Sequence, residues 1–196
     1  MFERRLDMPM QQRLWQMCQQ LSHGQVPMYN PTVRGGKTMS VGMLCLGKHW
    51  NGRTYRYEDV RSDFDGLAVP PIPSEMLDIA RSAATDAGFE MQPDVCIMNF
   101  YDSAAKMGVH QDKDERPDTI TAGIPIVSVS MGDAGRFVIG GLSRHDATVP
   151  LILRSGDVLV MGGPSRLRYH GITRILPGTA PEGMGSGRFN LTFRQY

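Results

Sequence analysis

Cysteine is scarce in this sequence, and its few copies exclude two ways of stabilising a domain. The three residues, Cys18, Cys45 and Cys96, are odd in number and far apart, and none belongs to a Cys-x-x-Cys pair. Neither a disulfide framework nor a cysteine zinc site is therefore expected. Such usage is typical of a reducing compartment, and we expect the protein to be cytoplasmic.

Long hydrophobic runs are also lacking. No apolar stretch approaches the roughly 18 residues that a membrane span requires. The N-terminus opens with the charged residues Glu3, Arg4 and Arg5, which does not match a signal peptide. Hydrophobic residues make up 41% of the chain and charged residues 21%, which excludes wholesale disorder and a membrane bundle. The 196 residues predict one folded domain with no membrane partner.

An excess of charge of either sign is missing too. The 21 basic and 20 acidic residues leave a net charge of +1, which by itself argues against a nucleic-acid partner. The charges are unevenly spread, because positions 34–57 hold five basic residues and no acid, whereas positions 58–94 hold nine acids and two arginines. This segregation leaves two interpretations open: ordinary solvated faces, or a basic surface for phosphates.

Apolar residues at helical spacing predict two helices in the N-terminal half. The first covers residues 9–22, with Asp7 as its N-cap, and the second covers residues 74–87, with Ser74 as its cap. Between them, residues 38–46 have the pattern of a strand.

Short β-rich runs separated by turn residues follow the second helix. They cover residues 94–101, 106–111, 125–131, 136–140, 149–154, 157–161, 166–172 and 188–194. These runs predict an all-β half, as a sandwich or a barrel. We therefore expect an α+β fold that is mainly β, with residues 1–93 as its N-terminal section and 94–196 as its β core.

A His-x-Asp pair is the first candidate for chemistry. Residues two apart in a strand point to the same face, so His110 and Asp112 can reach one point, as two of the three ligands of a facial iron site. A solvated histidine beside an acidic turn is the simpler alternative. A third ligand would come from a distant strand, and His170, near the end of a β run, is the natural choice.

The C-terminal run has two distinct faces. Alternation places Arg188, Asn190, Thr192 and Arg194 on one face and three apolar side chains on the other. Two arginines on a buried face need anions, and a dicarboxylate bound next to a metal would supply them. Two more polar residues two apart on an earlier strand could hydrogen-bond the same ligand. They are Asn99 and Tyr101.

Several motifs in order carry a resemblance to a known family. They are His110-Gln111-Asp112-Lys113-Asp114-Glu115, Pro125-Ile126-Val127-Ser128-Val129-Ser130, Gly140-Gly141-Leu142, Ser155-Gly156-Asp157, Ser165-Arg166-Leu167, Tyr169-His170-Gly171 and Arg188-Phe189-Asn190-Leu191-Thr192-Phe193-Arg194-Gln195. From about residue 35 to the end, the chain resembles the AlkB family of Fe(II)- and 2-oxoglutarate-dependent dioxygenases. It departs from the family at the N-terminus, where members commonly have a strand before the first helix and none is expected here.

The resemblance implies a double-stranded β-helix, or jelly-roll, preceded by helices and a nucleotide-recognition lid. It also implies Fe(II) as cofactor, with 2-oxoglutarate and O2 as co-substrates. The implied iron ligands are His110, Asp112 and His170. The implied 2-oxoglutarate contacts are Asn99, Tyr101, Arg188, Asn190 and Arg194, with Arg188, Tyr101 and Asn190 on the distal carboxylate and Arg194 near the iron-bound end.

Substrate contacts follow from the same resemblance. Trp50 would stack on a flipped base, against the ring of His110, although Trp50 and Tyr55 could also simply pack the lid. The remaining implied contacts are Tyr55, Asp114 and Arg144. The expected protein is a monomer that demethylates N-alkylated bases such as 1-methyladenine and 3-methylcytosine in single-stranded DNA, or in RNA.

Two alternatives remain open from the sequence. One keeps iron and 2-oxoglutarate but acts on tRNA, a protein side chain or a small molecule. The other is a nucleic-acid binding module without catalysis, against which the intact set of ligands and arginines argues. The near-neutral net charge predicts a small phosphate footprint, with recognition concentrated on one base.

Overall fold

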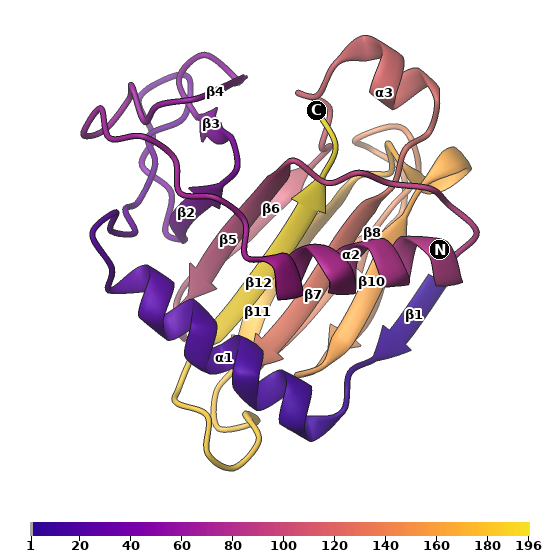
Figure 1. Cartoon of the computed structure of the whole chain (residues 1–196). Coiled ribbons are helices and arrows are strands. Elements are labelled where there is room, and N and C mark those ends of the chain that lie inside the picture. The colour runs from indigo at the N-terminus through magenta and orange to yellow at the C-terminus, as the bar shows by residue number, and fades with distance from the viewer. Residues whose placement is uncertain (1) are drawn as a thin grey trace.

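The computed structural model describes residues 2–196, with the side chains of residues 6–196. Two antiparallel sheets face each other, and two helices cover the outer face of the larger sheet (Figure 1). In spatial order, the larger sheet contains β1 (Phe2–Arg5), β10 (Asp157–Met161), β7 (Ile126–Gly132), β12 (Arg188–Arg194), β5 (Val95–Tyr101) and β2 (Gly42–Leu46).

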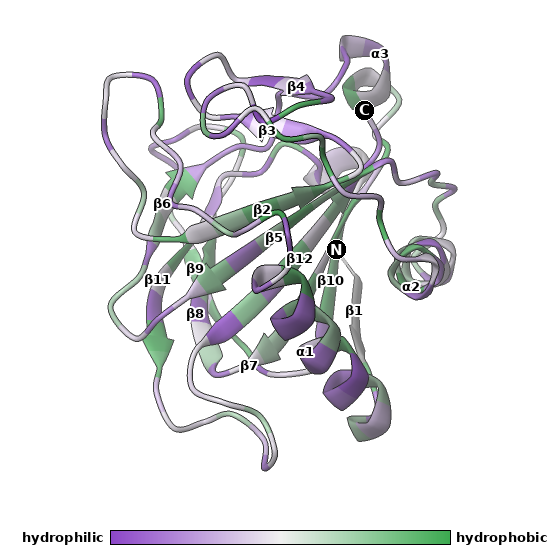
Figure 2. Ribbon diagram, turned by 60° about the vertical axis from the view of Figure 1, so that its left-hand side comes forward, coloured by the Kyte–Doolittle hydropathy of each residue, from purple (hydrophilic) through white to green (hydrophobic). Residues whose placement is uncertain are grey.

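The smaller sheet completes the β core. Its strands are, in spatial order, β6 (Met107–His110), β11 (His170–Leu176), β8 (Ala134–Ile139) and β9 (Val149–Leu153). From β5 onward the chain passes repeatedly from one sheet to the other. Figure 2 shows the smaller sheet facing the larger one. This winding is the double-stranded β-helix, so the predicted fold is confirmed.

Helices α1 (Met8–Ser22) and α2 (Ser74–Asp86) lie close to their predicted positions. Asp7 caps α1, because its Oδ1 accepts the backbone N–H of Met10 at 2.9 Å. The predicted cap of α2 is wrong: Ser74 is already helical, and the preceding proline occupies the cap position with no side-chain hydrogen bond. Among the described residues, no helix is long and apolar enough to span a membrane.

The N-terminal section contributes strands at both edges of the larger sheet. Strand β1 precedes α1 and pairs with β10, so the expectation that no strand precedes the first helix is wrong. Three of its four residues are charged, so the strand lacks the alternation of apolar and polar residues by which strands are predicted. At the other edge, β2 covers only the second half of the strand predicted at 38–46.

Strand β11 begins four residues later than predicted. The run expected at 166–172 is interrupted because the short helix η1 (Gly163–Ser165) and the turn after it occupy the chain as far as Tyr169. His170 is therefore the first residue of its strand, at the rim of the sheet. A short helix, α3 (Pro117–Thr121), was not predicted.

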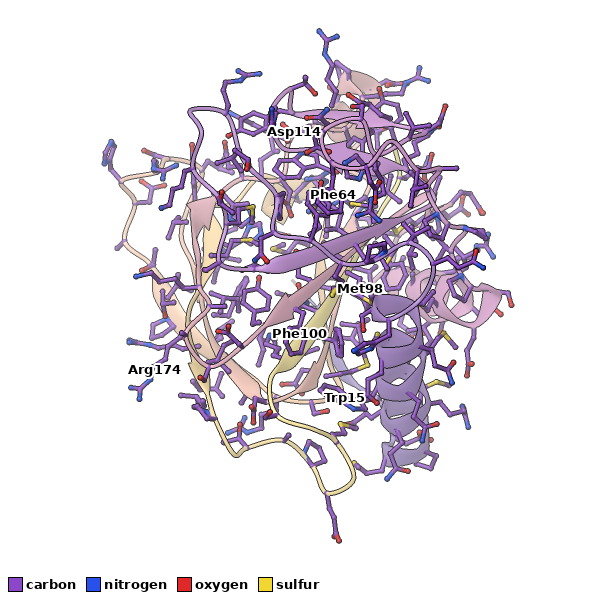
Figure 3. The ribbon with its side chains drawn as sticks, turned by 90° about the vertical axis from the view of Figure 1, so that its left-hand side faces the viewer. Trp15, Phe64, Met98, Phe100, Asp114 and Arg174 are labelled. Carbon is purple, nitrogen blue, oxygen red and sulfur yellow. The ribbon has the colours of Figure 1, made fainter. Side chains whose placement is uncertain are left out.

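Apolar side chains fill three clusters. One lies between the helices and the larger sheet, where Trp15 packs edge-on against Phe189 with ring centroids 5.0 Å apart. Figure 3 shows Trp15 beside the sheet, near Phe100 and Met98. A second cluster lies between the sheets and includes Tyr101 and Phe137. The apolar residues predicted on one face of β12 belong to the first cluster, which turns the polar face of β12 toward the smaller sheet.

A two-stranded hairpin stands apart from both sheets, at the end where β5 begins and β12 ends (Figure 1). We call it the lid hairpin: β3 (His49–Asn51), a tight turn and β4 (Arg56–Glu58). The Asn51 side chain orders the turn by accepting the backbone N–H groups of Arg53 and Thr54 at 2.9 and 3.1 Å. Tyr55 has a positive φ of 58°.

Candidate active site

Three side chains converge at the rim of the smaller sheet. His110 ends β6, His170 begins β11, and the two residues are directly paired across the ladder. Asp112 lies two positions beyond the end of β6, so it reaches the same point as His110 from the segment after the strand and not, as the sequence predicts, from within it. One ligand atom from each residue lies within 4.8 Å of the others, and no other group of three or more His, Cys, Asp or Glu side chains among residues 6–196 comes as close.

Both histidines have their rings fixed by backbone carbonyls. Nδ1 of His110 lies 2.9 Å from the oxygen of Gly108, and Nδ1 of His170 lies 2.9 Å from the oxygen of Arg168. A carbonyl oxygen only accepts, so each Nδ1 carries a proton, and Nε2 is the ring nitrogen left to bind a metal. Both Nε2 atoms lie 3.5 Å from an oxygen of Asp112. Two imidazoles and one carboxylate facing a common point fit a divalent iron ion with open positions.

The carboxylate of Asp112 is held in a buried ionic network. Arg194 Nη2 lies 2.9 Å from its Oδ1, and Arg194 Nη1 lies 3.0 Å from Glu115 Oε1. The other oxygen of Glu115 pairs with Arg166 at 2.7 Å, and Arg166 also donates to the backbone oxygen of Asp112 at 2.5 Å. Burial alone would raise the pKa of Asp112, but Arg194 and the two histidines hold it well below its usual range.

A cavity extends from the three ligands into the space between the sheets. It is lined by all the residues that the sequence assigned to iron and 2-oxoglutarate. Register explains the grouping, because Arg188 is paired with Tyr101 and Asn190 with Asn99 across β12 and β5. Asn190 is held by Ser128, whose Oγ accepts its Nδ2 at 2.8 Å.

One of the two arginines that line this cavity, Arg188, has no anionic partner among the described residues. Arg188 is 1% exposed, and it donates to Ser130 Oγ at 2.8 Å and to the oxygen of Leu153 at 3.4 Å, while its Nε has no partner. Burial lowers the pKa of its guanidinium to about 10. Within residues 6–196, no carboxylate forms an ion pair with it. A buried guanidinium left in this way is suited to bind a carboxylate from outside.

Arg194 differs from Arg188 in this respect. It lines the same cavity, but both of its Nη atoms already bind side chains of the protein, and only its buried Nε lacks a partner. Its contact with 2-oxoglutarate stays a prediction. The contact that the structure does form is to the iron ligand Asp112.

Trp50, Tyr55 and Asp114 come together at the lid hairpin. Trp50 Nε1 donates to Asp114 Oδ2 at 2.8 Å, and its ring stacks on that of Tyr55 with centroids 5.7 Å apart and planes 12° from parallel. The guanidinium of Arg34 covers the Tyr55 ring, 4.8 Å from its centroid. Figure 3 places Asp114 at this end of the molecule. Arg144 lies on the exposed turn between β8 and β9, and no contact among the described residues joins it to the other three.

Comparisons with known proteins agree with this donor set. The profile of the 2OG-Fe(II) oxygenase superfamily matches residues 6–194. The alpha-ketoglutarate-dependent dioxygenase AlkB of Escherichia coli K12 is 43% identical over 175 residues, which cover 87% of this chain and 78% of the relative. This chain belongs to the AlkB family. Fe(II) is its cofactor and 2-oxoglutarate its co-substrate, and the residues described above fit both.

Other AlkB-family proteins are similar over nearly the whole chain. The structure of OsALKBH1 has a TM-score of 0.91 at 38% identity and covers 97% of this chain and 93% of that one. The Arabidopsis thaliana protein named DNA N(6)-methyladenine demethylase ALKBH1C is 40% identical over 201 residues, which cover 91% of this chain and 44% of the relative. The chain therefore spans less than half the length of this relative.

Sequence reasoning gave no role to several buried polar residues of this AlkB-family site. Glu115 and Arg166 stand in motifs that carried the resemblance, yet their burial could not be read from spacing alone. Tyr57 and His49 lie between the strand predicted at 38–46 and the second predicted helix, where no particular element was expected. The ring of His49 is fully buried, and its Nε2 lies 2.6 Å from Asp63 Oδ1.

Proposed function

We propose that the chain is an Fe(II)- and 2-oxoglutarate-dependent oxidative demethylase of N-alkylated bases, of the 1-methyladenine and 3-methylcytosine type, in single-stranded DNA or in RNA. The observation that carries this proposal is the position of the Trp50–Tyr55 stack. Through Asp114, Trp50 is hydrogen-bonded two residues from the iron ligand Asp112. An aromatic pair so close to a metal ligand suits a planar base presented to the iron.

Relatives support a nucleic-acid substrate. The names of two similar proteins describe a DNA demethylase in Arabidopsis thaliana and a nucleic acid dioxygenase in Mus musculus. A base inside a duplex could not reach the ligands, so we infer that it is flipped or already single-stranded, at a cost of about a few kcal/mol. Stacking on an aromatic side chain returns about 1–3 kcal/mol per base.

Each part of the site then has a task. His110, Asp112 and His170 hold the iron. We assign the distal carboxylate of 2-oxoglutarate to Arg188, Tyr101 and Asn190, and the iron-bound end to the neighbourhood of Arg194, with Asn99 as a further contact. Trp50 stacks on the base, with Tyr55, Asp114 and Arg144 as further contacts. When bound there, iron, 2-oxoglutarate and O2 would supply the oxidising chemistry: an N-methyl group would be released as formaldehyde, and 2-oxoglutarate would become succinate and carbon dioxide.

The chain's organisation is part of the proposal. Residues 1–93 supply the helices and the lid, and residues 94–196 supply the catalytic core, although β1 and β2 also extend the core's larger sheet. We propose that the protein acts as a monomer in the cytoplasm, where its three buried cysteines stay free.

A direct assay tests the proposed function. The protein is incubated with Fe(II), ascorbate and 2-oxoglutarate, together with single-stranded DNA carrying 1-methyladenine, 3-methylcytosine or N6-methyladenine, methylated duplex DNA, or tRNA. We expect formaldehyde and unmodified base from single-stranded DNA that carries 1-methyladenine or 3-methylcytosine. The Asp112→Ala variant should give no product. Product from none of the methylated DNA or RNA substrates would refute the proposal.

Two control measurements separate the alternatives. Succinate formation that methylated oligonucleotides do not stimulate would indicate a protein or small-molecule substrate. Absence of iron from anaerobically purified protein, with His110→Ala as the reference for a broken site, would indicate a binding module without catalysis.

A further inference from the structure

The lid hairpin reaches the iron ligands by a route separate from Trp50. Tyr57, on β4, is 7% exposed, and its hydroxyl donates to Glu115 Oε1 at 3.2 Å. The same hydroxyl accepts Arg194 Nη1 at 3.2 Å, and Arg194 Nη2 binds Asp112 Oδ1 at 2.9 Å. Two consecutive contacts, Tyr57 to Arg194 and Arg194 to Asp112, therefore join a lid tyrosine to the carboxylate ligand, and Glu115 binds both Tyr57 and Arg194.

This connection is rigid at the end nearest the iron. Arg194 bridges the carboxylates of Asp112 and Glu115. Arg166 binds the other oxygen of Glu115. It also donates to the backbone oxygen of Asp112 and, at 2.9 Å, to that of Ile124. All these charges are buried, where each contact is stronger than it would be in water. A shift of Tyr57 must be matched by Arg194 or Glu115, because a partner left unpaired there would be costly.

The lid end of the connection is held more weakly. The hairpin has only three pairs of residues in register, and Tyr57 packs there among Tyr29, Cys45 and the ring of Tyr196, whose centroid lies 5.2 Å away. Burial raises the pKa of the Tyr57 hydroxyl well above its ordinary value, so the group keeps its proton at neutral pH.

We propose that Tyr57 is a positioning residue that couples the lid hairpin to the iron ligand Asp112 through Glu115 and Arg194. Filling the iron site orders the hairpin, and a base held by the hairpin sets the orientation of Asp112. Such coupling is reciprocal by thermodynamic necessity, so it is measurable from either end. The effect of a bound base on Asp112 rests on the proposed function. The effect of the filled iron site on the hairpin needs no nucleic acid.

The first test loads the metal site and observes the lid. Hydrogen–deuterium exchange of a peptide covering residues 48–60 is compared with and without Zn(II) and 2-oxoglutarate. Tyr57→Phe removes only the hydroxyl that makes the connection. Tyr29→Phe is the matched control, because its hydroxyl also contacts the lid hairpin, at His49, and beyond the hairpin Asp63, but contacts no partner of Asp112.

We expect loading to slow exchange of the hairpin amides in the native protein and in Tyr29→Phe. In Tyr57→Phe the slowing should shrink by about three- to tenfold, as for the loss of one or two buried hydrogen bonds. Equal slowing in Tyr57→Phe and the native protein would overturn the proposal, and so would a native protein whose hairpin does not respond to loading.

The second test loads the lid and observes the metal. With Co(II) in the site, visible absorption reports coordination geometry, and fluorescence anisotropy reports binding of a methylated oligonucleotide. Binding should change the Co(II) spectrum of the native protein and of Tyr29→Phe, and should change it far less in Tyr57→Phe. Binding without a spectral change in the native protein overturns the coupling. Absence of binding refutes the proposed function instead, and leaves the exchange experiment as the test of Tyr57.

Discussion

The iron pocket and the lid hairpin meet at one end of the molecule, but they are held by different means. The 2-oxoglutarate residues of the pocket lie on β5 and β12, strands of seven residues in the middle of a sheet, whose register sets which side chains meet. The lid residues lie on strands of three residues, outside both sheets. Their positions depend on side-chain hydrogen bonds and on a turn that Asn51 orders.

This difference has a functional meaning. Strand register fixes a pocket that must hold a metal and a small dicarboxylate at constant geometry, since metal sites tolerate little displacement. The hairpin, with three residue pairs in register, has fewer backbone bonds to break than the pocket strands, which suits the substrate-binding lid that we propose. We therefore expect that perturbing one region leaves the other region's binding function nearly intact, unless the change touches the residues that join them.

The largest effect is expected in the pocket, from Arg188→Met. Loss of the guanidinium that we assign to the distal carboxylate should weaken 2-oxoglutarate binding by about 30- to 5000-fold, the factor for 2–5 kcal/mol. The metal-free protein should be no less stable than the native one, because an unpaired buried cation is removed. Calorimetric titration with 2-oxoglutarate measures the first effect and thermal unfolding the second.

Arg174→Met is the matched control for Arg188→Met. Arg174 lies on β11 with an exposed side chain, and Figure 3 shows it pointing away from the core. Its loss should leave 2-oxoglutarate affinity unchanged. Native affinity in Arg188→Met would remove this residue from the co-substrate site.

A smaller effect is expected from the lid, with Trp50→Ala. Affinity for a methylated single strand should fall by about 5- to 150-fold, the factor for 1–3 kcal/mol of stacking. Substrate-independent succinate formation should stay within about twofold of the native rate, because the pocket is separate from the ring. If both quantities fell together, the two regions would not be independent. Trp15→Phe, a change at the buried tryptophan, should lower stability without lowering oligonucleotide affinity.

The last comparison concerns the pH dependence of stability and one of the residues that join the two regions, Glu115. Burial would raise the pKa of Glu115, but Arg194 and Arg166 lower it below its ordinary value. A carboxylate whose pKa is lowered by folding stabilises the protein above its unfolded pKa of about 4.3, and this stability is lost as the pH falls through the folded value. Urea unfolding between pH 7 and pH 3 should therefore show a shallower pH dependence in Glu115→Gln.

Glu115→Gln should also lower the free energy of unfolding at pH 7, by about 3–5 kcal/mol, because two buried arginines lose a charged partner. Glu75→Gln is the surface control. Its ion pair with Arg13 is largely exposed and should contribute less than about 1 kcal/mol. A pH dependence unchanged from the native protein would mean that Glu115 titrates normally in the folded state.

Prediction from sequence succeeded where the alternation of residues along a strand, or the separation of two residues in the chain, determines which side chains lie together. Alternation along β12 was enough to place Arg188 and Asn190 on one face, and the two-residue step from His110 to Asp112 was enough to aim both at one point. The jelly-roll itself came from the order of motifs in the family resemblance, because short β runs alone are equally typical of a sandwich and a barrel.

The rest of the site depends on contacts between distant segments. No local pattern indicates that Tyr57 meets Glu115, 58 residues away, or that Arg194 binds a carboxylate of the protein itself. The start of β11 was misplaced for a related reason, because β-prone residues after η1 are held in a turn by tertiary contacts such as that of Arg166. Buried ion pairs are invisible to periodicity, which registers apolar residues only.

If Arg188 binds 2-oxoglutarate as we propose, it links catalysis to the amount of folded protein. The anion that the reaction consumes would then also pair with a buried cation that forms no ion pair among the described residues. A ligand that binds only the native state adds stability that grows with its concentration. The supply of 2-oxoglutarate would then govern both the rate of turnover and the survival of the protein, so that a shortage lowers activity twice.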